Sequence, residues 1–377
     1  MVVFKVEHYI ISPMPVKKLL APFYEKLSLV LIGLIALGYL IILGKEVLDP
    51  LVFGFLFAIL LLPICNFFEK KFRLPRSIAS FMSIILLVGF ISGIVYLVGS
   101  QISNLADDWP MLKKQVGQSL DDLSVYIQHA FHINLEKQMD YVHNATNKIV
   151  ESGSSVAATT FGAVSSLLLF YSFIIIFTFL ILFYRRLLLK FLIWVFSEEN
   201  SAIVLDIVEN IQSILRKYII GLLLEMFIVA CVACTAFWLI GIKYAVLLGL
   251  FVGLFNIIPY VGIFSALLLS CIITFATGNI ADTIKVAVSV LSIHIIDSNF
   301  LMPIVVGSKV RLNALITFLG IVIGEMMWGL SGMFLSIPII AILKIIFDRI
   351  ESLKPWGFLF GGEYEYKKSA EKAMKTE

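Results

Sequence analysis

Charged side chains are scarce in this chain. Aspartate, glutamate, lysine and arginine make up 15% of its 377 residues, whereas soluble domains hold about 25%. Hydrophobic residues make up 60% and the mean hydropathy is +0.99. This composition excludes a soluble globular domain. The net charge of +3 is too small to indicate a nucleic-acid partner.

Cysteine is also rare, and it offers no recognisable site. The four cysteines all lie in apolar segments (Cys65, Cys231, Cys234 and Cys271). Cys231 and Cys234 have the spacing of a zinc or redox pair, but no second ligand pair accompanies them. Small apolar packing residues are the better interpretation, so we predict no metal, no disulfide and no cofactor.

Motifs of other protein classes are missing as well. The chain holds no His-Glu-x-x-His, no Gly-x-Ser-x-Gly and no close pair of membrane aspartates, so an intramembrane enzyme is not indicated. It holds no P-loop, so ATP is not expected to be the energy source within this chain. Residues 1–26 are polar and mixed, and no cleavage site follows the first apolar run, so no cleavable signal peptide is predicted.

Long apolar runs dominate instead. A membrane-spanning helix needs about 17–25 apolar residues, and six runs qualify: Leu27–Leu43, Leu51–Phe68, Ile78–Gly99, Phe161–Tyr184, Ile219–Ile240 and Thr283–Met302. If the N-terminus is cytoplasmic, most of the 29 lysines and arginines fall on the inside, as the positive-inside rule requires. The sequence therefore predicts an all-α, multi-pass protein of the bacterial cytoplasmic membrane with both termini inside.

Two further apolar stretches are each broken in the middle. Their arms have 14 or 15 residues, about 22 Å of helix, against a hydrocarbon core of about 30 Å. The arms are Tyr244–Ile258 and Ile263–Thr277 around Pro259–Gly262, then Leu315–Trp328 and Met333–Ile346 around Gly329–Gly332. Paired broken segments are typical of a transporter's binding site. Short, tilted, fully spanning arms are the alternative to re-entrant hairpins.

These segments form an inverted repeat in the predicted topology. One full helix precedes each broken pair, and the two units face opposite ways. Gly249-x-x-x-Gly253 opens the first pair and Gly320-x-x-x-Gly324 the second, and this spacing lets helix backbones approach closely. An inverted repeat places the substrate near the midplane of the membrane.

About eight membrane segments and a few soluble pieces make up the predicted organisation. An extracytoplasmic insert contains two amphipathic helices, a linker at Glu151–Ser155 and a kink at Pro110. The expected parts are an N-tail (1–26), three helices (27–100), the insert (101–160), a fourth helix (161–184), a cytoplasmic amphipathic region (185–217), the transport core (218–346) and a C-tail (347–377).

Polar residues at membrane depth are candidates for the binding site, because each ionisable group there costs about 2.5–3.5 kcal/mol or more. The candidates are Glu225, Asn256, Pro259, Tyr260, Gly262, Ser292, His294, Asp297, Asn299, Pro303 and Glu325. Three ordinary explanations stay open. Asp297 and Asn299 could satisfy backbone groups freed before Pro303, Glu225 could reach the cytoplasmic interface, and His294 could join two helices.

Several motifs of the chain together resemble those of a known family. Ile257-Ile258-Pro259-Tyr260-Val261-Gly262 looks like the Ile-Pro-Tyr-x-Gly signature of the autoinducer-2 exporter family of bacterial membrane proteins. The other matching motifs are Asp297-Ser298-Asn299 with Pro303 and Gly307, Gly324 to Gly332 with Pro338, Tyr218-x-x-Gly221, and Leu353-Lys354-Pro355-Trp356-Gly357. The resemblance covers nearly the whole chain.

The resemblance implies an eight-segment carrier that forms a homo-oligomer, a pentamer in similar proteins, and that works by an elevator-like movement. It implies export of a small polar solute or signal such as autoinducer-2, with Na⁺(Li⁺)/H⁺ antiport as the alternative. One departure is that Leu222 follows Gly221, where many members have glutamine, and this departure raises interest in Glu225. Glu225, Asp297 and Glu325 are the carboxylates that would serve proton or cation coupling. A passive channel fits the Gly-rich, repeated second half less well.

Overall fold

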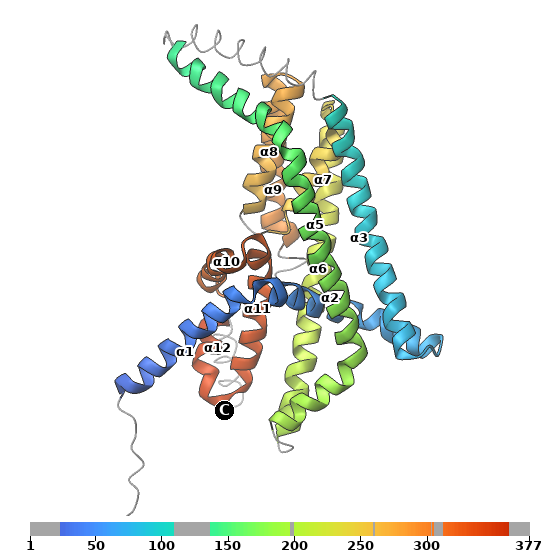
Figure 1. Cartoon of the computed structure of the whole chain (residues 1–377), viewed down its shortest axis with the longest axis vertical. Helices are drawn as coiled ribbons and strands as arrows, with labels where there is room; N and C mark the ends of the chain where they lie inside the picture. The colour runs from blue at the N-terminus through green and yellow to red at the C-terminus, as the bar shows by residue number, and fades with distance from the viewer. Residues whose placement is uncertain are drawn as a thin grey trace, which may run out of the picture. The chain divides into compact units, whose positions relative to one another are not determined.

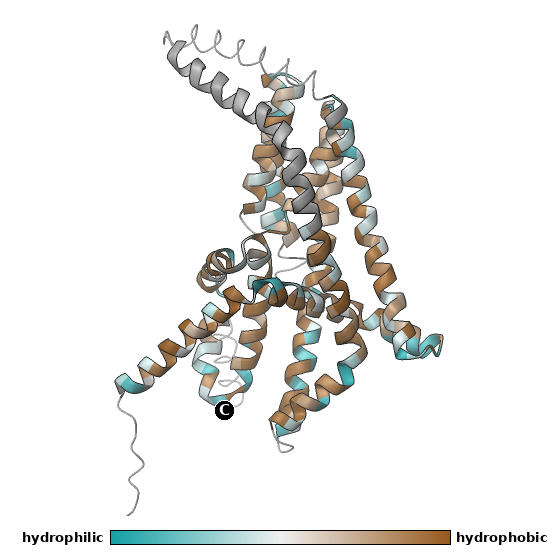
Figure 2. Cartoon of the chain, viewed as in Figure 1, coloured by the Kyte–Doolittle hydropathy of each residue, from teal (hydrophilic) through white to brown (hydrophobic). Residues whose placement is uncertain are grey.

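The computed structural model describes residues 23–108, 136–196, 200–258, 261–302, 304 and 312–361. All regular structure in these ranges is helical, which confirms the predicted all-α class. Six of the described helical segments are long and apolar enough to cross a membrane: 45–71, 76–105, 166–195, 201–240, 280–301 and 330–349. Figure 2 shows hydrophobic residues along most of the length of these helices.

The first helix, α1 (Phe23–Leu43), forms a unit of its own. Its residues 27–43 are apolar and nearly all exposed. A single helix with apolar side chains all round is suited to contact with lipid, as expected of a membrane segment. The remaining helices form the second unit.

Three helices of the second unit pack together around a common core: α2 (Lys45–Lys71), α3 (Arg76–Asp107) and α5 (Glu136–Val195). Gly54 on α2 lets α5 come close, because a Cβ added there would lie 2.8 Å from the Cβ of Phe177. Arg185 on α5 donates two hydrogen bonds of 2.7 and 2.8 Å to the Glu69 carboxylate of α2. This ion pair fastens the far end of α2 to α5.

Four helices enclose the second core: α6 (Ser201–Ile240), α7 (Ala245–Phe255), α8 (Val261–Thr277) and α9 (Ile280–Ile296). Figure 1 shows α8 and α9 side by side with α7 next to them. Gly249 and Gly253 make the contact between α7 and α6, because added Cβ atoms would lie 2.5 Å from the Cys234 backbone nitrogen and 2.8 Å from the Met226 carbonyl oxygen. The Gly249-x-x-x-Gly253 spacing therefore brings two backbones together, as predicted.

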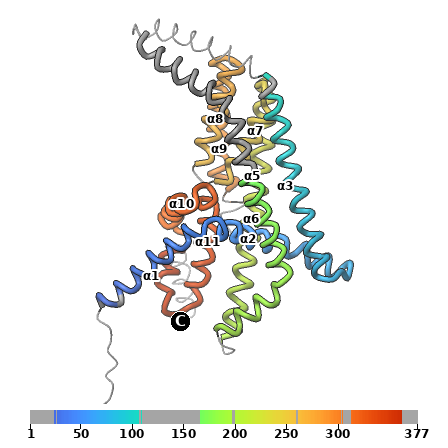
Figure 3. Tube along the Cα trace, viewed as in Figure 1, coloured from blue at the N-terminus to red at the C-terminus, as the bar shows by residue number. Residues whose placement is uncertain are grey.

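The last helices form a hairpin with a short closing helix: α10 (Ala314–Trp328), α11 (Leu330–Arg349) and α12 (Lys354–Gly361), with the 3-10 turn η4 (Glu351–Leu353) before α12. The turn between α10 and α11 is visible in the trace of Figure 3. Gly329 adopts a φ of 68° there, a conformation that favours glycine. The Ser336 hydroxyl donates to the carbonyls of Gly320 and Gly332, which ties the two arms together.

Some expected boundaries were wrong. Residues 151–155, expected to be a linker, lie inside the 60-residue helix α5, since one glycine among helix-compatible residues does not stop a helix. The amphipathic residues 201–217 continue directly into the fifth span within the 40-residue α6. One arm of the second pair is longer than expected, because α11 has 20 residues and could span by length alone. The expected kink at Pro110 and most of the insert's first helix lie outside the described residues.

Candidate functional site

Glu225 lies on the buried face of α6. Six buried residues of this stretch of α6 recur at steps of three and four: Tyr218, Gly221, Glu225, Val229, Ala233 and Phe237. This periodicity turns one face of the helix towards α7 and α9. Glu225 occupies one position of that stripe and is 5% exposed, so its side chain is buried between the helices.

Asp297 reaches the same place from α9. The buried face of α9 comprises Val286, Val290 and Ile293, and Asp297 continues it at 5% exposure. At Asp297 the helix widens into a π-turn, η2 (Asp297–Leu301), in which the Met302 N–H donates to the Asp297 carbonyl. Such wide turns are frequent at functional sites.

Asn256 joins the two acids. It follows the last residue of α7, at the end of the first arm of the broken pair. Its Nδ2 donates to Asp297 Oδ2 at 3.1 Å and to Glu225 Oε1 at 3.4 Å. One side-chain amide therefore bridges two buried carboxyl groups from two other helices. We call Glu225, Asn256 and Asp297 the polar cluster.

The polar cluster is not fully satisfied. Glu225 Oε2 and Asp297 Oδ1 are buried and have no hydrogen-bond partner among the described residues. Nδ1 of His294, one turn before Asp297, is also buried and lacks a partner within the described part of the chain. Buried polar atoms are normally hydrogen-bonded. These three atoms can therefore still bind a ligand, a proton or a water molecule.

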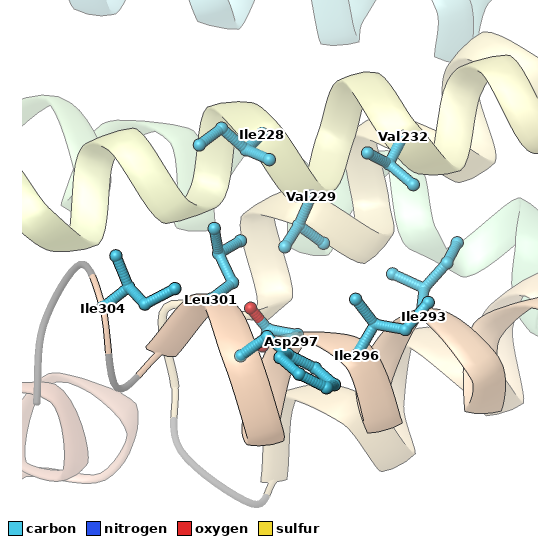
Figure 4. Close-up of a pocket in the computed structure, with 9 residues that line it drawn as sticks. Ile228, Val229, Val232, Ile293, Ile296, Asp297, Leu301 and Ile304 are labelled. Atoms are coloured by element: carbon cyan, nitrogen blue, oxygen red, sulfur yellow. The ribbon is translucent and has the colours of Figure 1, made fainter.

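A groove of about 190 Å³ runs beside the polar cluster, between α6 and the end of α9 with η2. Figure 4 shows Ile228, Val229 and Val232 on the α6 side, facing Ile293, Ile296 and Leu301 across it. Among the described residues that line it, Asp297 is the one with a polar side chain. The groove is thus an apolar approach to one wall of the cluster.

The other sequence candidates fall in different environments. Asn299 and Ser292 are exposed and donate to carbonyls of their own helix, at Ile295 and Val288, both at 2.7 Å. The Ile295 carbonyl lies eight residues before Pro303, so this bond does not satisfy a backbone group freed by that proline, and the backbone role considered for Asn299 stays a prediction. Gly262 is buried against the chain end of α7, where an added Cβ would lie 1.8 Å from the Phe255 carbonyl oxygen. Pro259, Tyr260 and Pro303 lie outside the described residues.

Glu325 does not join the polar cluster. It lies on α10 with an exposed side chain, and within the described ranges its carboxylate has no hydrogen bond or ion pair. Its backbone carbonyl accepts the Gly329 N–H at 2.7 Å and so closes the hairpin turn.

Sequence reasoning missed Asp49, which is 3% exposed on α2. The rule that acids at membrane depth are functional candidates applies to it too. Asp49 was overlooked because the apolar run was taken to begin at Leu51, whereas α2 begins at Lys45. The two residues before the run, Asp49 and Pro50, are therefore part of the helix and buried.

A second polar group ties α3 to the turn between α6 and α7. Lys243 Nζ lies 2.7 Å from Asp108 Oδ2, and the Tyr244 hydroxyl donates to the same oxygen. These donors, Lys243 first, hold the pKa of Asp108 below its usual value, and Asp108 in turn raises the pKa of Lys243. The group lies beyond the ends of the spans, so it serves to connect helices.

Long apolar helices around a buried polar cluster define a multi-pass helical membrane protein with a polar site between its helices. The chain belongs to the AI-2E family of transporters, whose family model matches residues 29–352. It is 26% identical to YrrI of Bacillus subtilis over 317 residues, covering 80% of this chain and 86% of YrrI. It is 25% identical to YueF of the same organism over 308 residues, 77% of this chain and 80% of YueF. Both are described as candidate transport proteins with no substrate named.

A relative with a named substrate is the AI-2 transport protein TqsA of Escherichia coli. It is 22% identical over 325 residues, which cover 84% of this chain and 91% of TqsA. These relatives match along almost their full length, so the chain is a membrane transport protein by family. They also confirm the family resemblance read from the motifs.

Proposed function

We propose that this protein is a secondary transporter that exports a small polar solute through a site built on the polar cluster. The observation that carries this proposal is the meeting of Glu225 and Asp297 on the Asn256 amide, at the break of the first helix pair. Transporters bind substrates and coupling ions where membrane helices are interrupted, because backbone groups and polar side chains are available there.

The two carboxyl groups favour coupling to a proton or a monovalent cation. Their bridged oxygens both lie within 3.4 Å of one nitrogen, so they are no more than about 6.5 Å apart. Two full negative charges at that separation repel by about 2.5 kcal/mol at an effective dielectric constant of about 20. One bound proton or cation removes this repulsion, and transport can use its binding and release.

Two substrate classes follow from the chemistry of the site. A small neutral, hydroxylated signal molecule such as the AI-2 named for TqsA would use the amide and carboxyl groups as hydrogen-bond partners. Sodium or lithium in exchange for protons is the second candidate, and the paired carboxylates favour it, since oxygen ligands suit hard cations.

Flux into proteoliposomes tests the proposal. Purified protein should move labelled autoinducer-2, or ²²Na⁺, at a rate that depends on an imposed pH gradient. Asp297→Asn and Glu225→Gln keep the shape of the side chains and remove their titration, so each should abolish the gradient dependence. Asp282→Asn is the matched control, because Asp282 lies on α9 and its partners among the described residues are Asn279 and Lys285, near the start of that helix. Gradient-dependent flux that survives in both cluster variants would refute this assignment.

Glu325 stays a proposed coupling residue and needs its own test. Lipid does not solvate a charged carboxylate. An exposed carboxylate on an apolar helix must therefore contact water or another subunit, or be protonated. Glu325→Gln should alter the pH dependence of flux without lowering expression. Unchanged pH dependence would assign Glu325 a structural role only.

The mode of movement and assembly belongs to the same proposal. Two units of one full helix and one broken pair support re-entrant hairpins in an inverted repeat, an elevator-like movement and a homo-oligomer in a bacterial cytoplasmic membrane. Native mass spectrometry in detergent measures the oligomer, for which a pentamer is expected.

The proposed orientation has both termini inside and the insert outside, because most basic residues then lie on the cytoplasmic side. In a variant free of native cysteines, an impermeant thiol reagent should label Asn134→Cys in intact cells but not Lys368→Cys. Labelling of Lys368→Cys would overturn the orientation.

A further inference from the structure

Asp49 is a buried acid that the polar cluster does not use. Its side chain on α2 is 3% exposed, and its Oδ1 has no hydrogen-bond partner in the described structure. A buried carboxylate without donors is costly. Lys45, one turn earlier on α2, contributes positive potential, but no hydrogen-bond donor among the described residues reaches Oδ1.

The N-terminus of α11 lies next to this acid and lacks a cap of its own. Gly329 occupies the N-cap position and has no side chain to accept from the first turn. The first N–H groups of a helix have no acceptor within it, and they carry the positive end of the helix dipole. The start of α11 therefore offers N–H donors that no side chain at its N-cap accepts, and Asp49 has an acceptor atom without a partner.

Two contacts show that the two elements face each other. Ser331, in the first turn of α11, interacts with the Asp49 carboxylate. One turn further along both helices, the rings of Phe53 and Phe334 stack at 5.6 Å and 3°. The first turn of α11 is therefore held against α2 by one polar contact and one ring pair.

We propose that Asp49 is a positioning residue that caps the N-terminus of α11 from α2 and so holds the α10–α11 turn in place. The positive end of α11 disfavours a cation at the same point, so the carboxylate is the occupant. Because α2 is fastened to α5 through Arg185 and Glu69, the cap connects the hairpin to the block of α2, α3 and α5. For a transporter this contact must loosen if the hairpin moves, and only that consequence rests on the proposed function.

Hydrogen–deuterium exchange of the detergent-solubilised full chain tests the cap without any substrate. Asp49→Asn removes the charge, so the amides of residues 333–337 should exchange about 5- to 30-fold faster, while the other helices are unchanged. Asp49→Glu should keep part of the protection. Glu46→Gln is the matched control, since Glu46 is exposed one turn earlier on α2 and should change nothing.

Two outcomes would overturn the proposal. One is unchanged exchange of residues 333–337 in Asp49→Asn, and the other is faster exchange in all helices, which would mean a general loss of packing. If Asp49→Asn does not fold, Ser331→Ala replaces it, with a smaller rise expected in the same five residues and no change there counting against the cap. The result is independent of transport, so failure of the flux experiments leaves it intact.

Discussion

Asn256→Ala is the sharpest test of the polar cluster. The substitution removes the one donor that the two carboxyl groups share. The bond to Asp297 at 3.1 Å has normal length, whereas the bond to Glu225 at 3.4 Å is long and contributes less. Hydrogen bonds to charged groups are worth about 1.5–3 kcal/mol, so the expected loss is about 2–3 kcal/mol, almost all of it from the Asp297 bond.

The loss should appear in thermal unfolding of the purified protein in detergent. By the scaling for domains of about 150–250 residues, 2–3 kcal/mol lowers Tm by roughly 4–12 °C. Adding Asp297→Asn to Asn256→Ala should restore most of the lost Tm, because the second change removes one of two facing charges and adds an amide donor. Recovery in the double variant separates a charge effect from a simple cavity.

Asn299→Ala serves as the control for Asn256→Ala. Asn299 is also an asparagine beside Asp297, but it is exposed and donates only to the Ile295 carbonyl. Its loss should change stability by less than about 0.5 kcal/mol. The reasoning about the cluster fails if Asn256→Ala melts like the parent protein, or if Asp297→Asn makes that variant still less stable.

Two further predictions concern packing and pH. Gly332→Ala should lower the free energy of unfolding by about 1–3 kcal/mol or more, and with it Tm, because the added Cβ would lie 1.9 Å from the Gly324 carbonyl oxygen. Gly93→Ala should leave Tm unchanged, because its added Cβ meets nothing within 4 Å. The pKa of Asp108 is lowered by Lys243, so this contact stabilises the fold above the ordinary value of 3.8 and is lost as pH falls through the lowered pKa. The Tm advantage of the parent over Lys243→Met should therefore be steady at neutral pH and shrink only below about pH 4, and an advantage that disappears between pH 5 and 7 would contradict this.

Much of the architecture could be predicted from apolar runs and their breaks. The run at Ile219–Ile240 lies inside α6 and the run at Ile78–Gly99 inside α3, because burial in lipid demands long apolar helices whatever surrounds them. The boundaries of the helices were predicted less accurately. The serine-rich residues 151–155 read as a linker, yet α5 continues through them, since helix propensity differs by fractions of a kcal/mol per residue and context overrides it.

Among the acids, Glu225, Asp297 and Glu325 looked alike from the sequence. Position in a helix decided which could face inward, but only packing showed that two of them share Asn256 while Glu325 lies exposed on α10. Asp49 shows the same limit from the other side, because its neighbour Ser331 is far away in the chain and no local pattern connects them.

The sequence by itself determined that the helices lie in lipid, that the fold is helical, how many apolar segments there are and which family the chain belongs to. Each of these depends on local composition or on motifs that can be read along the chain. The tertiary structure decided which polar groups meet. Glu225, Asn256 and Asp297 come from three helical segments whose rotation and depth depend on close contacts, such as the contact of Gly253 of α7 with Met226 of α6. Helical periodicity places a side chain on a face, but only the packing of whole helices places two faces opposite each other.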